Sequence, residues 1–346
     1  MESITIVIPV YNEEIFISDC LKSVLAFKIP SGLDYEIWVL DGGSSDDTIK
    51  IIRNHQAQGN KLTLMRNPGK TQSHAMNLAV GKSNSDWIMR LDGHSIYPED
   101  YLVNLYKTAL ESDAANVGGI WDVQRNGETL SDYMVHSLIT HPFGVGNSGF
   151  RTGMKSGIVD TVPYGFFKRK IFTKVGLFDE RLVRAQDYEF NRRLIKYGFQ
   201  VWLNPEIRIS YFPKGNIFQV LKKYTLLEAP YNAYMWYLAP YTFSFRHIIT
   251  IFFIFGLIGG AVLSTYFGFI RYIYFSVLVL YSLLALSAAM QVSIKNKKFS
   301  LILLMPLTYF IFHVLHGFGV LGGLIRLMFN NAPVQKLSRQ IGKNKK

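Results

Sequence analysis

Apolar residues gather in four short runs in the amino-terminal part of the chain, and polar residues and then a segment of helical spacing follow each run. The runs cover residues 4–10, 35–40, 62–65 and 87–91. Apolar and β-branched residues in such runs are typical of strands that are buried on both faces of a parallel sheet. Strands and helices that alternate at this spacing predict βαβ units and a mostly parallel, doubly wound α/β sheet.

After residue 98 the alternation loosens into an α+β portion. The pattern there predicts helices over residues 130–140 and 187–197 and short strands over 201–205 and 207–211. Residues 141–157 are rich in glycine and serine. A loop of that length predicts a functional lid or a disordered segment.

The carboxyl-terminal third of the chain is strongly apolar. The stretch between His247 and Arg271 carries no charge and is long enough to cross the roughly 30 Å of bilayer hydrocarbon. Residues 272–294 form a second such span. A third, over residues 299–325, contains Pro306 and either crosses fully or is broken and re-entrant.

We therefore expect four parts in the chain. Residues 1–215 form the catalytic domain, and residues 216–246 alternate apolar, aromatic and basic side chains, as interfacial amphipathic helices do. Residues 247–328 form the transmembrane region, and residues 329–346 form a basic tail. For residues 216–246 the alternative is a helix packed on the catalytic domain.

The net charge of +12 comes from the apolar part of the chain. Basic and acidic residues balance up to Lys214, and beyond it Glu228 is the only acidic residue. This placement is typical of basic flanks at an anionic cytoplasmic leaflet and argues against nucleic-acid binding.

Cys20 is the only cysteine, which excludes an intrachain disulfide. The first residues lack the layout of a secretion signal, so we expect a cytoplasmic catalytic domain on the inner (plasma) membrane.

Acidic side chains follow three of the four strands. Glu13 comes after the first strand, Asp41 after the second, and Asp92 with His94 after the fourth. Open α/β sheets bind ligands at the edge formed by the carboxyl ends of their strands. A carboxylate oxygen and an imidazole nitrogen both suit a divalent ion. The pattern predicts a metal site at Asp92 and His94, with a plain polar strand end as the alternative.

Four motifs occur in one order within residues 1–215. They are Val10-Tyr11-Asn12-Glu13, Asp41-Gly42-Gly43-Ser44-Ser45-Asp46, Asp92-Gly93-His94 and Gln186-Asp187-Tyr188-Glu189-Phe190-Asn191-Arg192-Arg193. Together they resemble the inverting family 2 glycosyltransferases, which have the GT-A fold, a Rossmann-like and mostly parallel sheet flanked by helices. The third motif and residues 159–169 are similar to the succinoglycan-type exopolysaccharide glucosyltransferases.

The resemblance implies a nucleotide-sugar donor, most often a UDP-sugar. It places four residues around the uridine: Pro9, Tyr11, Glu13 and Asp41. Lys70 is implied for the donor's phosphates or base, and Asp92 and His94 for Mg²⁺ or Mn²⁺ at the diphosphate. His94 replaces the family's second aspartate, and its nitrogen favours Mn²⁺. The alternatives are a helix-start charge for Glu13, a turn residue for Asp41 and a solvated surface lysine for Lys70.

The resemblance also implies that Asp187 is the general base, with Gln186 in place of the family's glutamate. The alternative for Asp187 is a helix cap. Contacts to the acceptor or to phosphate are assigned to three basic residues, Arg169, Arg192 and Arg193. For the last two, pairing with Glu189 is the alternative.

We therefore expect a membrane-bound, metal-dependent, inverting hexosyltransferase. Its reaction moves a sugar from a UDP-sugar to a polyprenyl-diphosphate-linked acceptor in polysaccharide biosynthesis. One alternative is a processive polysaccharide synthase, although no Gln-x-x-Arg-Trp motif follows Asp187. An alternative from another class is a non-catalytic membrane scaffold with a degenerate transferase domain.

Overall fold

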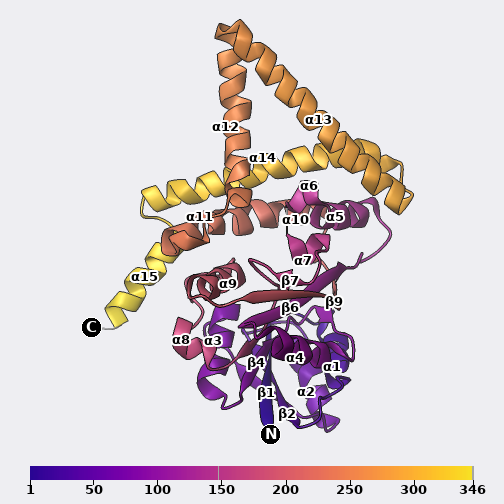
Figure 1. Ribbon diagram of the computed structural model, residues 1–346, viewed down its shortest axis with the longest axis vertical. Coiled ribbons are helices and arrows are strands. Elements are labelled where there is room, and N and C mark those ends of the chain that lie inside the picture. The colour runs from indigo at the N-terminus through magenta and orange to yellow at the C-terminus, as the bar shows by residue number, and fades with distance from the viewer. Residues whose placement is uncertain (147, 345–346) are drawn as a thin grey trace. The chain divides into compact units, whose positions relative to one another are not determined.

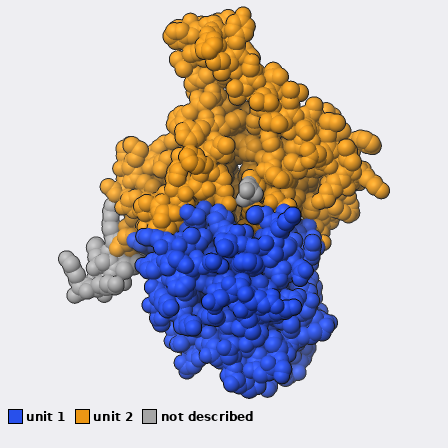
Figure 2. Space-filling model, viewed as in Figure 1, with its two compact units in different colours: residues 1–123, 153–212 blue, residues 124–152, 213–346 orange. Residues whose placement is uncertain are grey.

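The computed structural model describes residues 1–146 and 148–344 (Figure 1). Two compact units make up the chain (Figure 2): residues 1–123 with 153–212, and residues 124–152 with 213–346. The sequence suggested that the catalytic domain is continuous and ends at residue 215. Residues 124–152 group with the second unit because their helices pack against its long apolar helices, as described below.

The first unit is built on one mixed sheet with the strand order β3-β2-β1-β4-β8-β6-β9-β5, and β7 lies beside β9. The first four strands along the chain are parallel, as the sequence predicts: β1 (Glu2–Val10), β2 (Leu33–Asp41), β3 (Leu62–Arg66) and β4 (Trp87–Arg90). The remaining strands are β5 (Ser95–Ile96), β6 (Asn116–Val123), β7 (Gly157–Ile158), β8 (Gly165–Lys168) and β9 (Val201–Tyr211). Because β8 runs antiparallel between β4 and β6, the sheet is mixed beyond β4.

Helices flank this sheet: α1 (Ile17–Leu25), α2 (Thr48–Ala57), α3 (Gln72–Lys82), α4 (Tyr101–Ser112), α8 (Ile171–Val175) and α9 (Gln186–Lys196). The helix expected near residues 187–197 is thus present. The α/β fold class inferred from the periodicity is confirmed.

β9 is a single strand that passes through Pro205, so the prediction of two short strands there was wrong. Proline has no N–H for the sheet ladder, and the neighbouring strand β6 shifts register between Gly118 and Ile120 at this level. A Cβ on Gly119 would lie 2.0 Å from the carbonyl oxygen of Ile207. Glycine therefore permits the close approach that keeps β9 continuous.

Aromatic side chains pack α9 onto the sheet. Phe190 of α9 stacks on Phe178 with ring centroids 4.3 Å apart and on Phe172 at 5.3 Å. Asn191 lies beside it and accepts a hydrogen bond from Asn116 Nδ2 of β6 at 2.6 Å. The amino end of α9, where Asp187 lies, is thereby fixed against the sheet.

The second unit is helical within the described residues. Its elements are α5 (Leu130–Thr140), α6 (Pro142–Val145), α7 (Gly149–Thr152), α10 (Ile217–Lys223), a π-helical turn (Tyr224–Glu228), α11 (Ala229–Leu238), a 3₁₀ turn (Pro240–Thr242), α12 (Phe245–Tyr266), α13 (Gly268–Asn296), α14 (Ser300–Met328) and α15 (Pro333–Asn344). The stretch 141–157 therefore contains two short helices, and its last residue begins β7. Within its described residues it is not the disordered segment that was one of the two predicted alternatives.

α12 and α13, and a third stretch that begins with α14, are long and apolar enough to cross a membrane, with mean hydropathies of 2.3, 2.1 and 1.8. α12 and α13 form a hairpin (Figure 1). α14 continues through Pro306 without the break that the sequence left open. His313 of α14 bonds to Tyr281 of α13 and to the carbonyl of Phe143 in α6, each at 2.9 Å. The bond to Phe143 is one of the contacts that join residues 124–152 to this unit.

Candidate active site

The carboxyl edge of the parallel strands brings together the loops that carry the sequence motifs. Val10 at the end of β1 pairs with Asp41 at the end of β2. Arg90, at the end of β4, pairs with Val7 of β1, and Asp92 follows it. Pro9 lies within β1 beside Leu40, one position before Val10.

Asp41 is 6% exposed, and its carboxylate accepts hydrogen bonds from the backbone N–H groups of Gly43 at 2.9 Å and Ser44 at 3.1 Å. Its carbonyl accepts from Asn67 N at 2.7 Å, which brings the turn of Lys70 beside it. A Cβ on Gly42 would lie 3.1 Å from the Lys70 carbonyl oxygen. The structure thus brings Asp41 and Lys70 together and also gives Asp41 a turn-forming role.

The loop after β1 is tied to the loop after β2. Asn12 has a left-handed backbone (φ 52°), its N–H donates to Ser44 Oγ, and its Oδ1 accepts from Ser45 N at 2.9 Å. Tyr11 beside it is 56% exposed. An exposed ring on an anchored loop is available to a ligand at this edge.

His94 is paired with Glu13. Its Nδ1 lies 3.2 Å from Glu13 Oε1, and the two side chains are 17% and 9% exposed. When Nδ1 carries the proton donated to the carboxylate, Nε2 keeps its lone pair for a metal ion. The structure therefore places Glu13, expected at the nucleotide, against the predicted metal ligand His94.

The central feature of the site is an ion-pair bridge that sequence reasoning missed. Arg90 Nη2 donates to Asp92 Oδ1 at 2.9 Å, and Arg90 Nη1 donates to Asp187 Oδ1. Arg90 is 2% exposed and Asp92 is 7% exposed. A charged residue inside the apolar run Trp87-Ile88-Met89-Arg90-Leu91 was the available signal, because a buried cation requires an anionic partner.

Two glutamines complete the link between the same acidic residues. Gln72, at the start of α3, donates to Asp92 Oδ1 at 3.2 Å and accepts from Gln186 Nε2 at 2.6 Å. Gln186 precedes Asp187 on α9. Gln186 thus acts in this network through Gln72, a residue that no sequence motif indicated.

Asp187 does not cap its helix. The residue before α9 is Ala185 in a left-handed conformation with no side-chain cap, and the Asp187 carboxylate bonds to Arg90 instead. Desolvation raises the pKa of Asp187 above its ordinary value, Arg90 opposes this shift, and Asp92 adds to it. The Asp187 side chain remains 27% exposed. A reachable carboxylate with a raised pKa suits a general base.

Buried hydroxyl groups hold the turn after β4. Tyr97 Oη accepts from Asp92 N at 2.8 Å and donates to the Asp92 carbonyl at 3.1 Å. Tyr164 Oη lies 2.7 Å from Ser95 Oγ. Burial raises the pKa values of both tyrosines well above the usual value, so both remain neutral.

The three arginines expected at the acceptor or phosphate lie in different places. Arg193 bonds to Glu189 and to the carbonyls of Val175 and Leu177, so its charge is used inside the fold. Arg169 follows Lys168, which pairs with Trp87 at the amino end of β4, so the structure does not bring it to the site. Arg192 is half-buried on α9.

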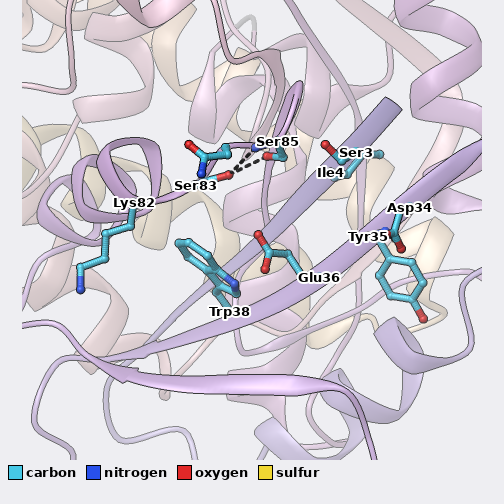
Figure 3. A pocket seen from close by; sticks show the side chains of 10 residues that line it. Ser3, Ile4, Asp34, Tyr35, Glu36, Trp38, Lys82, Ser83 and Ser85 are labelled. Atoms are coloured by element: carbon cyan, nitrogen blue, oxygen red, sulfur yellow. Dashed lines mark hydrogen bonds between the residues drawn. The ribbon is translucent and has the colours of Figure 1, made fainter. Parts of the chain in front are cut away.

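A pocket of about 380 Å³ also lies at the opposite edge of the sheet (Figure 3). It is lined by the amino ends of β1 and β2 and by Ser83 and Ser85, whose hydroxyls bond to each other at 2.7 Å. Thr5 bonds to both serines and to Glu36. These hydroxyls satisfy one another, and the pocket contains none of the motif residues.

Among the described residues, no group of three or more His, Cys, Asp or Glu side chains could hold a metal ion. The predicted pair, Asp92 and His94, would provide two ligands. Two ligands fit an Mg²⁺- or Mn²⁺-type ion whose remaining positions are taken by phosphate oxygens and water. The residues present therefore fit a nucleotide-bound ion better than a permanently held one.

Comparison with known proteins finds relatives of this chain. Residues 5–176 match the model of Glycosyl transferase family 2. A relative 27% identical over 342 residues, covering 94% of this chain and 98% of its own, is the dolichyl N-acetyl-alpha-D-glucosaminyl phosphate 3-beta-D-2,3-diacetamido-2,3-dideoxy-beta-D-glucuronosyltransferase of Methanococcus voltae. The succinoglycan biosynthesis protein ExoA of Rhizobium meliloti is 28% identical over 221 residues, or 63% of this chain and 66% of ExoA.

Among solved structures, mannosyltransferase PcManGT from Pyrobaculum calidifontis, in complex with GDP-Man and Mn²⁺, matches with a TM-score of 0.53 and 19% identity over 95% of this chain and 86% of that one. The fold is of the GT-A type. Residues 5–176 form a glycosyl transferase family 2 domain.

Proposed function

We propose that the chain is a membrane-bound, inverting glycosyltransferase that moves a sugar from a UDP-sugar to a lipid-linked sugar acceptor at the cytoplasmic face of the plasma membrane. The observation that carries the proposal is the Asp92-Arg90-Asp187 bridge. It holds a carboxylate suited to the donor and a carboxylate suited to the acceptor at one edge of the sheet.

On the donor side, Pro9, Tyr11 and Asp41 surround the nucleotide and Lys70 lies near its phosphates. Asp92 and His94 would hold a divalent ion, with Glu13 orienting the imidazole. When bound, this ion supplies positive charge that stabilises the departing nucleoside diphosphate. The Mn²⁺ named in the complex of the mannosyltransferase supports a divalent ion here.

On the acceptor side, Asp187 accepts the proton of the acceptor hydroxyl as its oxygen attacks the anomeric carbon. The bond from that carbon to the diphosphate oxygen breaks on the opposite face, so the configuration is inverted. The nucleoside diphosphate leaves with the electron pair of the broken bond. A carboxylate that is partly exposed and already turned toward the site is suited to this step.

The acceptor class follows from the rest of the chain and its relatives. Three stretches are apolar enough to cross a membrane, and the relative that matches over nearly its whole length is named for transfer to a dolichyl-linked sugar phosphate. These observations support a polyprenyl carrier. The proposed acceptor is therefore a polyprenyl phosphate or diphosphate that carries a sugar.

The test is transfer by the full-length protein in lipid nanodiscs with Mn²⁺. A panel of UDP- and GDP-sugars is offered with polyprenyl-phosphate and polyprenyl-diphosphate sugars, and products are identified by mass spectrometry. We expect one sugar to be added to one carrier with inversion. Long products would instead indicate a processive synthase, and absence of transfer and of donor hydrolysis would indicate a non-catalytic scaffold.

A further inference from the structure

Arg90 ends β4, a central strand of the sheet, and its side chain is only 3% exposed. Burying a guanidinium in a sheet is costly unless its charge is paired. Arg90 pairs with the two carboxylates that the proposed function assigns to opposite sides of the sugar, Asp92 and Asp187. A purely structural ion pair would need only one of them.

The guanidinium joins these carboxylates as a fork. Nη2 donates to Asp92 and Nη1 donates to Asp187, so each carboxylate uses a different nitrogen of one rigid plane. The ring of Tyr164 lies 5.7 Å from the guanidinium carbon and limits how the plane can turn. The spacing of the two carboxylates is therefore set by the spacing of the two nitrogens.

The two carboxylates depend on Arg90 to different degrees. Asp92 also accepts a hydrogen bond from Gln72 at 3.2 Å, whereas Arg90 is the partner that the structure shows for the Asp187 carboxylate. Asp187 is also the more exposed, with 27% of its side chain accessible against 10% for Asp92. Loss of the fork would release Asp187 far more than Asp92.

We propose that Arg90 is a positioning residue that holds the Asp187 carboxylate at a fixed distance from the donor site on Asp92. The inference rests on the proposed function, in which Asp187 takes the acceptor proton. Arg90 touches no reacting atom and accepts no proton. Its effect is on the chemical step, because a base displaced by about 1 Å can lose about 10²-fold in rate.

The test compares Arg90→Lys with the matched control Arg193→Lys in the full-length protein. Lysine keeps the charge but has one nitrogen, which cannot reproduce the fork. Arg193 is also a partly buried arginine in an ion pair, 13% exposed with Glu189 at 3%, and it lies farther along α9. Three quantities are measured for each variant: the melting temperature, the affinity for UDP with Mn²⁺ by calorimetry, and kcat and KM for transfer.

For Arg90→Lys we expect kcat to fall by about 10²-fold while UDP-Mn²⁺ affinity changes by less than about tenfold, since Gln72 still holds Asp92. Arg193→Lys should melt at a temperature similar to that of Arg90→Lys but keep the kcat of the wild-type protein. If both variants lose the same fraction of activity, or if Arg90→Lys loses donor affinity and not kcat, the inference is overturned. Should Arg90→Lys not fold, Arg90→Gln is measured in the same way. Wild-type protein without transfer activity would instead refute the proposed function.

Discussion

At the scale of single residues, the chemistry of the site depends on pairs that are distant along the chain. Asp187 and Arg90 are separated by 97 positions, and His94 and Glu13 by 81. Each pair changes the role of its members. Asp187 bonds to Arg90 and does not cap its helix, and Glu13 orients the ring of His94. The residue-scale predictions therefore concern these side chains.

Replacing Asp187 with asparagine tests its role as the base. Asn caps helices about as well as Asp, so a capping residue would tolerate the change. A general base would not, because an amide does not take a proton, and turnover should fall by roughly 10²-fold or more. UDP-Mn²⁺ affinity, measured by calorimetry, should persist because Asp92 and His94 are intact. Near-normal turnover would exclude Asp187 as the base.

Removing the divalent ion tests the donor site, where Asp92 is the predicted metal ligand. EDTA and Asp92→Ala should each abolish transfer, because charge on the departing diphosphate is then left without compensation. Added Mn²⁺ should restore the EDTA-treated wild type and not the alanine variant. Transfer at full rate in metal-free buffer would contradict the metal site.

At the scale of elements, a glycine in β6 allows β9 to approach closely, and β9 carries Tyr211 to the site. β6 and β9 approach at Gly119 so closely that a Cβ would lie 2.0 Å from the Ile207 carbonyl oxygen. β9 can therefore run unbroken through Pro205 to Tyr211. The ring of Tyr211 lies 5.6 Å from that of His94, which links this strand to the site.

Gly119→Ala should therefore destabilise the protein by about 3 kcal/mol, because the added methyl group has no room. Gly81→Ala is the control: Gly81 lies in α3 with no atom within 4 Å of an added Cβ. There alanine should stabilise the helix by about 0.5–1 kcal/mol. Thermal unfolding of the full-length variants in detergent measures both. The packing argument fails if Gly119→Ala melts at the wild-type temperature.

At the scale of the whole molecule, contacts inside the second unit lead to a prediction of membrane topology. α12 has 22 residues, about 33 Å at 1.5 Å per residue, which is enough to cross a bilayer. α14 meets the first turns of α12, where His316 lies 2.9 Å from Thr250. Toward its end α14 meets α11, where a Cβ on Gly323 would lie 2.7 Å from the Pro230 carbonyl oxygen. The end of α14 therefore lies on the side where α12 begins.

These contacts predict that α12 and α13 cross the membrane and that α14 returns its end to the cytoplasm, in accord with the positive-inside rule. Single cysteines at Arg271, Lys297 and Ser338 in a Cys20→Ser background test this with an impermeant thiol reagent on intact cells. We expect labelling at position 271 only, and labelling at the other two after permeabilisation. Labelling of position 338 from outside would show that α14 crosses fully.

The sequence by itself determined the first four strands, the acidic residues that follow three of them and the apolar helices of the carboxyl-terminal third. Each of these depends on local periodicity or on short motifs. Only the tertiary structure decided that Arg90 bridges Asp92 and Asp187, that Gln72 joins the network, and that Arg169 lies at the other edge. Those outcomes depend on β8 entering antiparallel beside β4 and on α9 packing over the sheet. Contacts between distant segments are set by packing of the whole unit, which no local pattern encodes.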